Sequence, residues 1–188
     1  MDKQNLFIFV ADSLRYDYLP ETVAAEGTVI PTLAPSPRSP SSFASLVTGK
    51  AVRSHAVRSF HDTLSPSHTT LFDRFEEGSY YDHEDDPVRK TVLQHAPPTK
   101  ELAELDQGFV FFERAMESHF PYNEIPHGNP LKHQDMDAGE LSQYSRRELR
   151  QRYQEGVDGV ADHFWDHVQE LEDRGLRENT LIVFTSDH

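Results

Sequence analysis

The stretch LIVFTSDH, residues 181–188, decides the fold more than any other part of the sequence. Its first six residues are mostly apolar and rich in β-branched side chains, which is typical of a buried strand, and Asp187 and His188 follow at the exit. A second apolar run, LFIFVA at residues 6–11, leads in the same way into Asp12. Parallel strands end at one edge of a sheet, where open α/β sheets bind ligands. The pattern therefore predicts a metal site at that edge, with Asp12, Asp187 and His188 as ligands.

Strand and helix patterns alternate outward from these two runs. The expected strands are residues 5–11, 109–113 and 180–186, and the expected helices lie within residues 16–27, 41–48 and 143–174. The longest helix is predicted by apolar residues spaced three or four apart, at Leu149, Tyr153, Val157, Val160, Phe164, Val168 and Leu171, and Gly175 should end it. This alternation indicates an α/β fold, with a mainly parallel sheet sandwiched by helices.

The remaining segments are expected to be irregular. Residues 31–40 are rich in Pro and Ser and predict a loop. Residues 60–105 are polar and read as a connecting region, lid or insertion, with one short helix near residues 67–76. Residues 118–140 carry several Gly and Pro residues and also predict a loop. All of these belong to a single domain, residues 1–188.

The composition narrows the classes of partner. The formal net charge is −14, with 32 acidic against 18 basic residues, of which five are lysines. Such a surface would repel nucleic acid, and it suits a halophilic protein or an ordinary acidic cytosolic one. The chain has no cysteine, which excludes disulfides and thiolate metal sites. We see neither a signal peptide nor a membrane segment, so we expect a cytoplasmic protein.

Several polar residues have both a chemical and a structural reading. Ser39 precedes the helix SSFASLVT, with Pro40 at the first helical position, so Ser39 is either an N-cap or a nucleophile at a helix N-terminus that favours anions. Lys50 and His55 follow this helix and either bind ester oxygens or are solvated loop residues. His119 lies in a loop after strand 109–113, where it could protonate a leaving group.

Two other histidines invite a metal-site reading. His163 and His167 lie four residues apart on the predicted long helix and flank Phe164 and Trp165. Because the sequence places no third ligand near them, we interpret them as structural or exposed.

Four segments together resemble the sulfatase branch of the alkaline phosphatase superfamily. VADSLRYDYL resembles its first metal-binding strand, SPSSFASLVTGKAVRSHAV its nucleophile helix, FVFFERAMESHFPY its histidine loop, and the segment from RYQEGV to FTSDH its long helix and second metal-binding strand. The resemblance implies an alkaline-phosphatase-like fold and a metal-dependent hydrolase of small-molecule sulfate or phosphate esters. Carried over by position, Asp12, Asp187 and His188 hold the metal, Ser39 is the nucleophile and His119 the acid.

Three features depart from the family pattern. Phe43 occupies the place, four residues after the nucleophile, where sulfatases often carry the Arg of the formylglycine motif. Ser13 follows Asp12 where many members have a second carboxylate, which removes a candidate calcium ligand. Family members run to several hundred residues, so the chain looks like a truncated N-terminal portion.

The departures leave the chemistry and the metal open. The alternatives to an ester hydrolase are a phosphodiesterase or phosphoglycerol-type transferase of the same superfamily, and an inactive gene fragment or non-catalytic anion-binding domain. Oxygen ligands suit Ca²⁺, Mg²⁺ or Mn²⁺, and the imidazole of His188 also admits Zn²⁺.

Overall fold

A four-stranded parallel sheet forms the centre of the computed structural model, which describes residues 4–82, 86–122 and 144–188. Its strands are β1 (Asn5–Ala11), β2 (Glu77–Tyr81), β3 (Phe109–Ala115) and β4 (Thr180–Ser186), in the order β2-β3-β1-β4. Ala11 at the end of β1 lies level with Ala115 of β3 and Ser186 of β4. The residues that follow these three strands therefore leave the sheet at one edge, as expected from the sequence.

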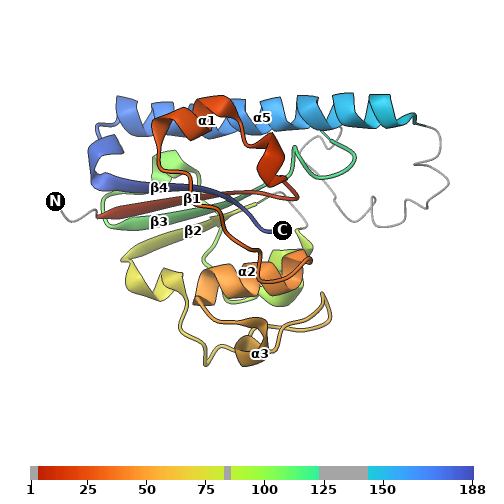
Figure 1. Cartoon of the computed structure of the whole chain (residues 1–188). Helices are drawn as coiled ribbons and strands as arrows, with labels where there is room; N and C mark the ends of the chain where they lie inside the picture. The colour runs from red at the N-terminus through yellow and green to blue at the C-terminus, as the bar shows by residue number, and fades with distance from the viewer. Residues whose placement is uncertain (1–3, 83–85, 123–143) are drawn as a thin grey trace.

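Helices cover both faces of this sheet (Figure 1). Helix α5 (Arg146–Asp173) and the short α1 (Glu21–Glu26) lie on one face, and α2 (Ser39–Thr48) and α3 (Val52–His55) lie on the other. The shorter turns are η1 (Tyr16–Tyr18), η2 (Leu71–Arg74), η3 (Val88–Val92), η4 (Leu102–Glu104) and η6 (Arg177–Asn179). The predicted α/β sandwich is confirmed.

Helix α5 follows the predicted pattern closely. Ser145 caps its start, accepting a hydrogen bond from the Glu148 N–H while the Glu148 side chain accepts one from the Ser145 N–H. Six of the seven predicted apolar residues are buried, and Leu149 in the first turn is half-buried. Gly175 ends the helical segment with a φ of 67°, a left-handed conformation that glycine adopts without strain.

Helix α2 begins one residue earlier than predicted. Arg38, not Ser39, is its N-cap, and Ser39 is the first helical residue. The Ser39 hydroxyl therefore makes no capping hydrogen bond and is available for other contacts. Gly49 ends the helix with a φ of 65°.

The region 60–105 is more ordered than the sequence suggested. Its strand β2 pairs with β3, and several of its apolar residues are buried in the core: Tyr80, Val88, Val92, Leu93, Leu102 and Leu105. The expected helix near residues 67–76 is only the 3-10 turn η2. The prediction of a lid or insertion was therefore wrong for β2 and the segment after it. The predicted loop 118–140 lies outside the described residues beyond residue 122.

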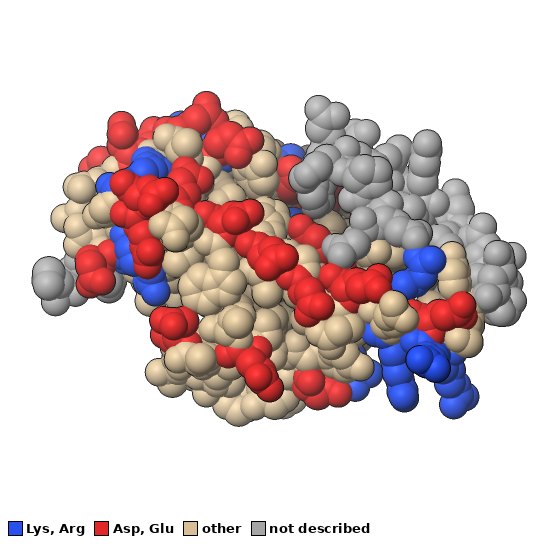
Figure 2. Space-filling view, turned by 90° about the horizontal axis from the view of Figure 1, so that it is seen from above, with Lys and Arg blue, Asp and Glu red and all other residues tan. Residues whose placement is uncertain are grey.

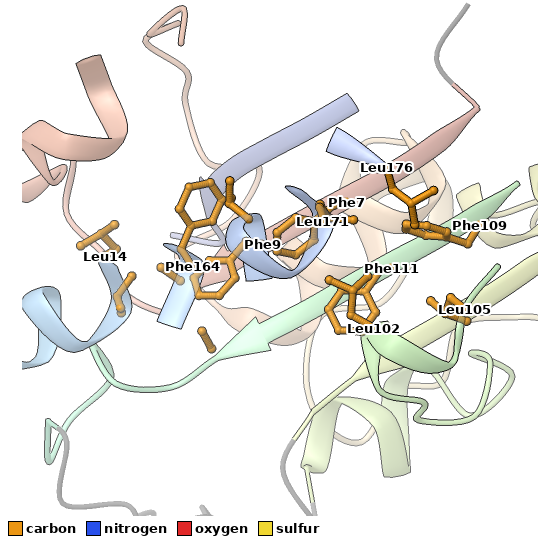
Figure 3. Packing of buried hydrophobic residues seen from close by; sticks show 14 of the residues in the cluster. Phe7, Phe9, Leu14, Leu102, Leu105, Phe109, Phe111, Phe164, Leu171 and Leu176 are labelled. Carbon is orange, nitrogen blue, oxygen red and sulfur yellow. The ribbon is translucent and has the colours of Figure 1, made fainter. Parts of the chain in front are cut away.

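The sheet separates two hydrophobic clusters. Phe164 and Leu171 of α5 pack against Phe7, Phe9 and Phe111, which point to one face of the sheet (Figure 3). A second cluster on the opposite face contains Val10, Phe43, Val47, Tyr80, Val88 and Phe112, with α2 packed over it. Because successive side chains of a strand point to opposite faces of the sheet, β3 contributes side chains to both clusters. This alternation sets the position of the polar residues described below.

Acidic side chains follow the outer face of α5 (Figure 2). They are exposed at Glu155, Asp158, Asp162, Asp166, Glu172 and Asp173, whereas the basic Arg146, Arg147 and Arg150 gather near the start of the helix. In the described part of the chain, no helix combines the length and apolar character that crossing a membrane requires.

Candidate functional site

The polar residues that follow β1 and β4 meet at the carboxyl edge of the sheet. Asp12, Asp187 and His188 each offer one ligand atom, and these atoms all lie within 4.8 Å of one another. Both aspartates are fully buried, whereas His188 is exposed. The structure thus brings together the three residues that the sequence singled out as metal ligands.

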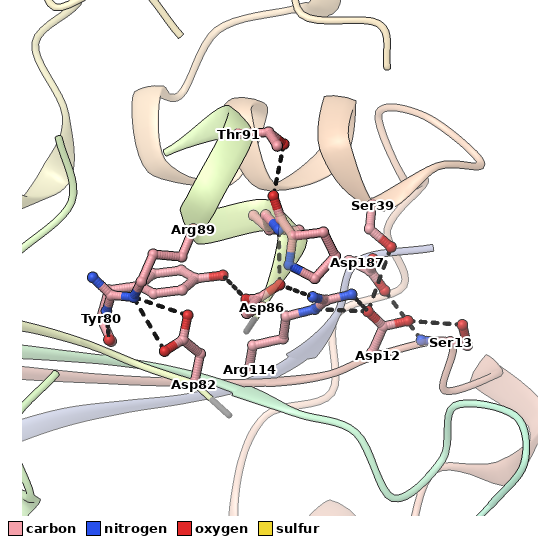
Figure 4. Close-up of polar contacts among 12 residues, drawn as sticks. Asp12, Ser13, Ser39, Tyr80, Asp82, Asp86, Arg89, Thr91, Arg114 and Asp187 are labelled. Carbon is pink, nitrogen blue, oxygen red and sulfur yellow. Dashed lines mark hydrogen bonds and ion pairs between the residues drawn. The ribbon is translucent and has the colours of Figure 1, made fainter. Parts of the chain in front are cut away.

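Ser39 joins this group from the first turn of α2 (Figure 4). Its Oγ lies 3.4 Å from Asp12 Oδ2 and 3.4 Å from His188 Nε2. Unpaired backbone N–H groups at this helix end favour a negatively charged group nearby. A buried hydroxyl between two potential ligands, at the start of a helix, is in the position that a nucleophile for an anionic ester requires.

Arg114 is the main element that the sequence analysis missed. Its Nε and Nη2 atoms donate to Asp12 Oδ2 at 2.9 and 2.7 Å, and its Nη1 pairs with Asp86 Oδ1. The guanidinium also lies over the ring of Phe43, 5.2 Å from its centroid. Phe43 therefore supports a buried cation that reaches the site from β3.

The two buried aspartates carry opposite electrostatic balances. Burial acts to raise the pKa of Asp12, but Arg114 and then His119 outweigh it, so the pKa lies below its usual value. Burial and the neighbouring charge of Asp12 raise the pKa of Asp187. Asp187 Oδ2 is buried and has no hydrogen-bond partner among the described residues, with His188 Nε2 3.6 Å away. Burial and the charge of Asp12 therefore outweigh His188 and Arg114 at this carboxylate, which fits a bound cation.

Ser13 connects the two aspartates. Its N–H donates to Asp187 Oδ1 at 3.1 Å and its hydroxyl donates to Asp12 Oδ1 at 2.8 Å. Ser13 has a φ of 61°, an uncommon left-handed conformation for a residue other than glycine. The Tyr153 hydroxyl of α5 donates to the Ser13 carbonyl at 3.0 Å and helps to hold this turn. Strained backbone of this kind is concentrated at functional sites.

His119 lies beside the site, at a surface cavity of about 380 Å³. Ser13, Tyr18, Ser118 and Tyr153 line the same cavity. The Nδ1 atom of His119 is 2.7 Å from the Phe120 carbonyl oxygen, which can only accept, so Nδ1 carries a proton. Its Nε2 atom is thus the one that remains for acid–base chemistry.

Lys50 and His55 are not brought into this group. Lys50 follows the end of α2 opposite to Ser39, and its Nζ contacts His68 Nδ1 at 2.9 Å. The His55 ring is buried and both of its nitrogens have partners. Val57 N–H donates to its Nδ1, and its Nε2 donates to Ser45 Oγ at 2.9 Å. The structure therefore does not bring Lys50 or His55 to the group around Ser39.

A second group of potential ligands lies on the opposite face of the sheet. Glu113, His163 and His167 also place one ligand atom each within 4.8 Å of one another. The sequence analysis interpreted both histidines as structural or exposed because it found no third ligand near them, and the fold supplies one. The missing partner is Glu113, which precedes His163 by 50 positions along the chain and reaches it only in the fold.

The chain matches a known protein family and a curated relative. A family model described as Sulfatase matches residues 10–188. The chain is similar to a Haloferax volcanii protein named low-salt glycan biosynthesis sulfotransferase Agl7, with 34% identity over 198 residues. This match covers 98% of the chain and 46% of the relative, so the chain spans about half the relative's length. No solved structure gives a significant match.

Proposed function

Because the chain belongs to the sulfatase family, we propose that it cleaves sulfate or phosphate esters with Ser39 as the nucleophile. The observation that carries this proposal is the position of Ser39 Oγ, 3.4 Å from both Asp12 Oδ2 and His188 Nε2. These atoms come from α2 and from the residues that follow β1 and β4, which are far apart in the sequence. Their convergence at a helix N-terminus supports a site for an anionic ester.

A divalent cation would complete this site. Asp12, Asp187 and His188 would hold it, and the buried, unpartnered Asp187 Oδ2 is an available donor atom. When bound, such a cation lowers the pKa of a nearby hydroxyl and offsets charge on the ester oxygens. The oxygen-rich donor set favours Ca²⁺, Mg²⁺ or Mn²⁺, and Zn²⁺ also fits the imidazole.

The residues of the chain suggest a substitution in two halves. Ser39 Oγ forms a bond to sulfur or phosphorus and loses its proton toward Asp12 Oδ2, the atom to which it donates. The ester bond breaks, and its electron pair leaves with the alcohol oxygen, which takes a proton from His119 Nε2. An acceptor oxygen, whose proton passes to His119 Nε2, then attacks the same sulfur or phosphorus and releases Ser39, which regains its proton from Asp12. Arg114 fixes the Asp12 carboxylate throughout.

Transfer to a sugar hydroxyl is a second candidate for the last half. The similar Haloferax volcanii protein is named a sulfotransferase of glycan biosynthesis. Phe43 in place of an arginine also separates this chain from sulfatases that rely on formylglycine. The two candidates share the attack by Ser39 and differ only in whether water or a glycan hydroxyl receives the group.

The Ser39→Ala variant tests the proposal, with Ser42→Ala as its matched control. Ser42 lies on the same helix and is also buried, but its hydroxyl donates to the Ser36 carbonyl and not to the site. We expect turnover of p-nitrophenyl sulfate or phosphate with Mg²⁺, Ca²⁺ or Mn²⁺ to fall by at least about 10³-fold in Ser39→Ala only. Intact-mass measurement should also detect the sulfated or phosphorylated Ser39 protein.

The outcomes separate the rival functions. Full activity in Ser39→Ala would remove Ser39 as the nucleophile. Transfer of label from the ester to an added oligosaccharide, in preference to water, would favour the transferase. Absence of both metal-dependent turnover and a covalent product would favour the non-catalytic alternative.

A further inference from the structure

We propose that Glu113, His163 and His167 form a second metal site, suited to Zn²⁺, between α5 and the sheet. His163 Nε2 lies 3.0 Å from Glu113 Oε1, and His167 Nε2 lies 2.8 Å from Glu113 Oε2. The two imidazoles therefore face the two oxygens of one carboxylate. Two imidazoles and a carboxylate form a common donor set for Zn²⁺ and related first-row metals.

The fold fixes these three residues on rigid elements. His163 and His167 are one helical turn apart on α5, so they project from the same face of the helix. Glu113 lies in the middle of the sheet on β3, level with Phe9 of β1. A helix and a central strand hold ligand positions more precisely than loops do.

Unsatisfied buried atoms point to a missing ligand at this position. Glu113 is 1% exposed, and its Oε2 has no hydrogen-bond partner among the described residues. His167 Nε2 and Glu117 Oε2 are also buried without such a partner. Although His167 Nε2 and Glu113 Oε2 are close, their approach does not have hydrogen-bond geometry. Donor atoms directed at a common centre, and not at one another, produce this combination.

A further carboxylate orients one of the ligands. His163 Nδ1 donates to Glu117 Oε1 at 2.8 Å, which leaves Nε2 directed at Glu113. Carboxylate–histidine pairs of this kind hold metal-binding imidazoles in the correct tautomer. Burial would lower the pKa of His163, but its contacts with Glu113 and Glu117 raise it to about 10.

Aromatic rings enclose the site on the sheet side. The ring of Phe9 meets His163 edge-on, and the rings of Phe7 and Phe111 lie within 5.6 Å of His167, centroid to centroid. A dry surround of this kind strengthens metal–ligand interactions. His163 keeps 24% of its side-chain surface exposed, which provides a route of entry. The bound metal would fasten α5 to β3, on the face of the sheet opposite to Ser39.

The competing explanation is a permanent ion pair between Glu113 and a protonated His163. Two titrations of the chelator-treated 188-residue chain distinguish these explanations. Calorimetry measures the binding of Zn²⁺, and the visible spectrum measures the binding of Co²⁺, which serves as a coloured substitute for Zn²⁺. The informative variants are Glu113→Gln, which keeps the shape but removes the anion, and Asp187→Asn, which alters only the first site. His61→Gln, an exposed histidine outside both groups, controls for weak surface binding.

We expect the Zn²⁺ ion of this second site to remain bound in Asp187→Asn and in His61→Gln, and to be lost in Glu113→Gln. Glu117→Gln should weaken this binding by about 10- to 100-fold, because it removes only the orienting partner. Co²⁺ should give a visible band that Zn²⁺ displaces in the unmodified chain, a result that does not depend on any variant folding. Zn²⁺ binding that is lost in Asp187→Asn but unchanged in Glu113→Gln would overturn the proposal of a second metal site. The proposal of a metal site at Asp12, Asp187 and His188 would still stand.

Discussion

The two groups of potential metal ligands lie on opposite faces of the sheet, and each is contacted by one of two neighbouring residues of β3. Glu113 reaches the α5 face, and Arg114 reaches the α2 face, because successive side chains of a strand point in opposite directions. On the α2 face the buried carboxylates of Asp12 and Asp86 already share the cation Arg114. On the α5 face one buried carboxylate, Glu113, is offset only by imidazoles.

This difference indicates how each group is neutralised. The Arg114 guanidinium is always charged and fixed in place, so it stabilises Asp12 and leaves Asp187 as the carboxylate short of a partner. Imidazoles can be neutral or charged, so the Glu113 group exchanges a proton for a metal more readily. The first group is thus a permanent ion-pair framework around the hydroxyl of Ser39. The second group is a proposed metal site that connects α5 to β3.

The largest expected effect comes from removing the fixed cation. Arg114→Met keeps an unbranched apolar stem in place of the aliphatic part of the arginine but leaves Asp12 and Asp86 buried without their cation. We expect a loss of about 3–5 kcal/mol in the free energy of unfolding, measured by urea denaturation. Glu113→Gln, one residue away, should cost only about 1–3 kcal/mol, because the amide still accepts a hydrogen bond from an imidazole.

The order of these two losses tests the comparison. A greater cost for Glu113→Gln than for Arg114→Met would show that the imidazole group, and not the arginine group, is the permanent ion-pair framework. Added Mg²⁺ or Ca²⁺ should partly restore the stability of Arg114→Met, because Asp12 then needs another cation.

The convergence of the first group and Ser39 could be predicted from the sequence because each residue lies at the end of a recognisable element. Asp12 and Asp187 come directly after apolar runs, and Ser39 precedes a helix, so the rule that parallel strands end at one edge is sufficient to bring them together. The sequence does not predict Arg114, because the expected strand ends at residue 113 and a charged residue directly after it reads as solvent-facing. Its partner Asp86 belongs to the acidic run EDD, which reads as a loop.

The second group requires information that no local pattern contains. His163 and His167 have ligand spacing, but Glu113 reaches them only through the packing of α5 on β3. Strand β2 escaped detection for a related reason, since its sequence EGSYY has neither alternation nor an apolar run. Its place in the sheet depends on pairing with β3 and on the packing of Tyr80 in the core.

A smaller effect is expected where α5 approaches the end of β3. A Cβ atom on Gly156 would collide with the Glu117 carbonyl oxygen. Gly156→Ala must therefore push α5 away from the segment that follows β3. We expect a loss of about 1–3 kcal/mol in the free energy of unfolding. Zn²⁺ affinity should fall as well, because Glu117 orients His163. Gly27→Ala is the control, since its Cβ would meet nothing within 4 Å. Equal effects of the two substitutions would show that this close approach is unimportant.

The smallest expected effect comes from the acidic face of α5. The exposed Asp162 and Asp166 precede His163 and His167 directly, so their charge should concentrate cations near the second group and not near the first. The double variant Asp162→Asn and Asp166→Asn should lower Zn²⁺ affinity at that group by about two- to five-fold at low ionic strength, or up to roughly 1 kcal/mol. The difference should vanish in 1 M salt, where the Debye length is about 3 Å. A loss that persists in high salt would mean that these aspartates coordinate the metal or support its ligands directly, and the two groups would then differ in size as well as in charge.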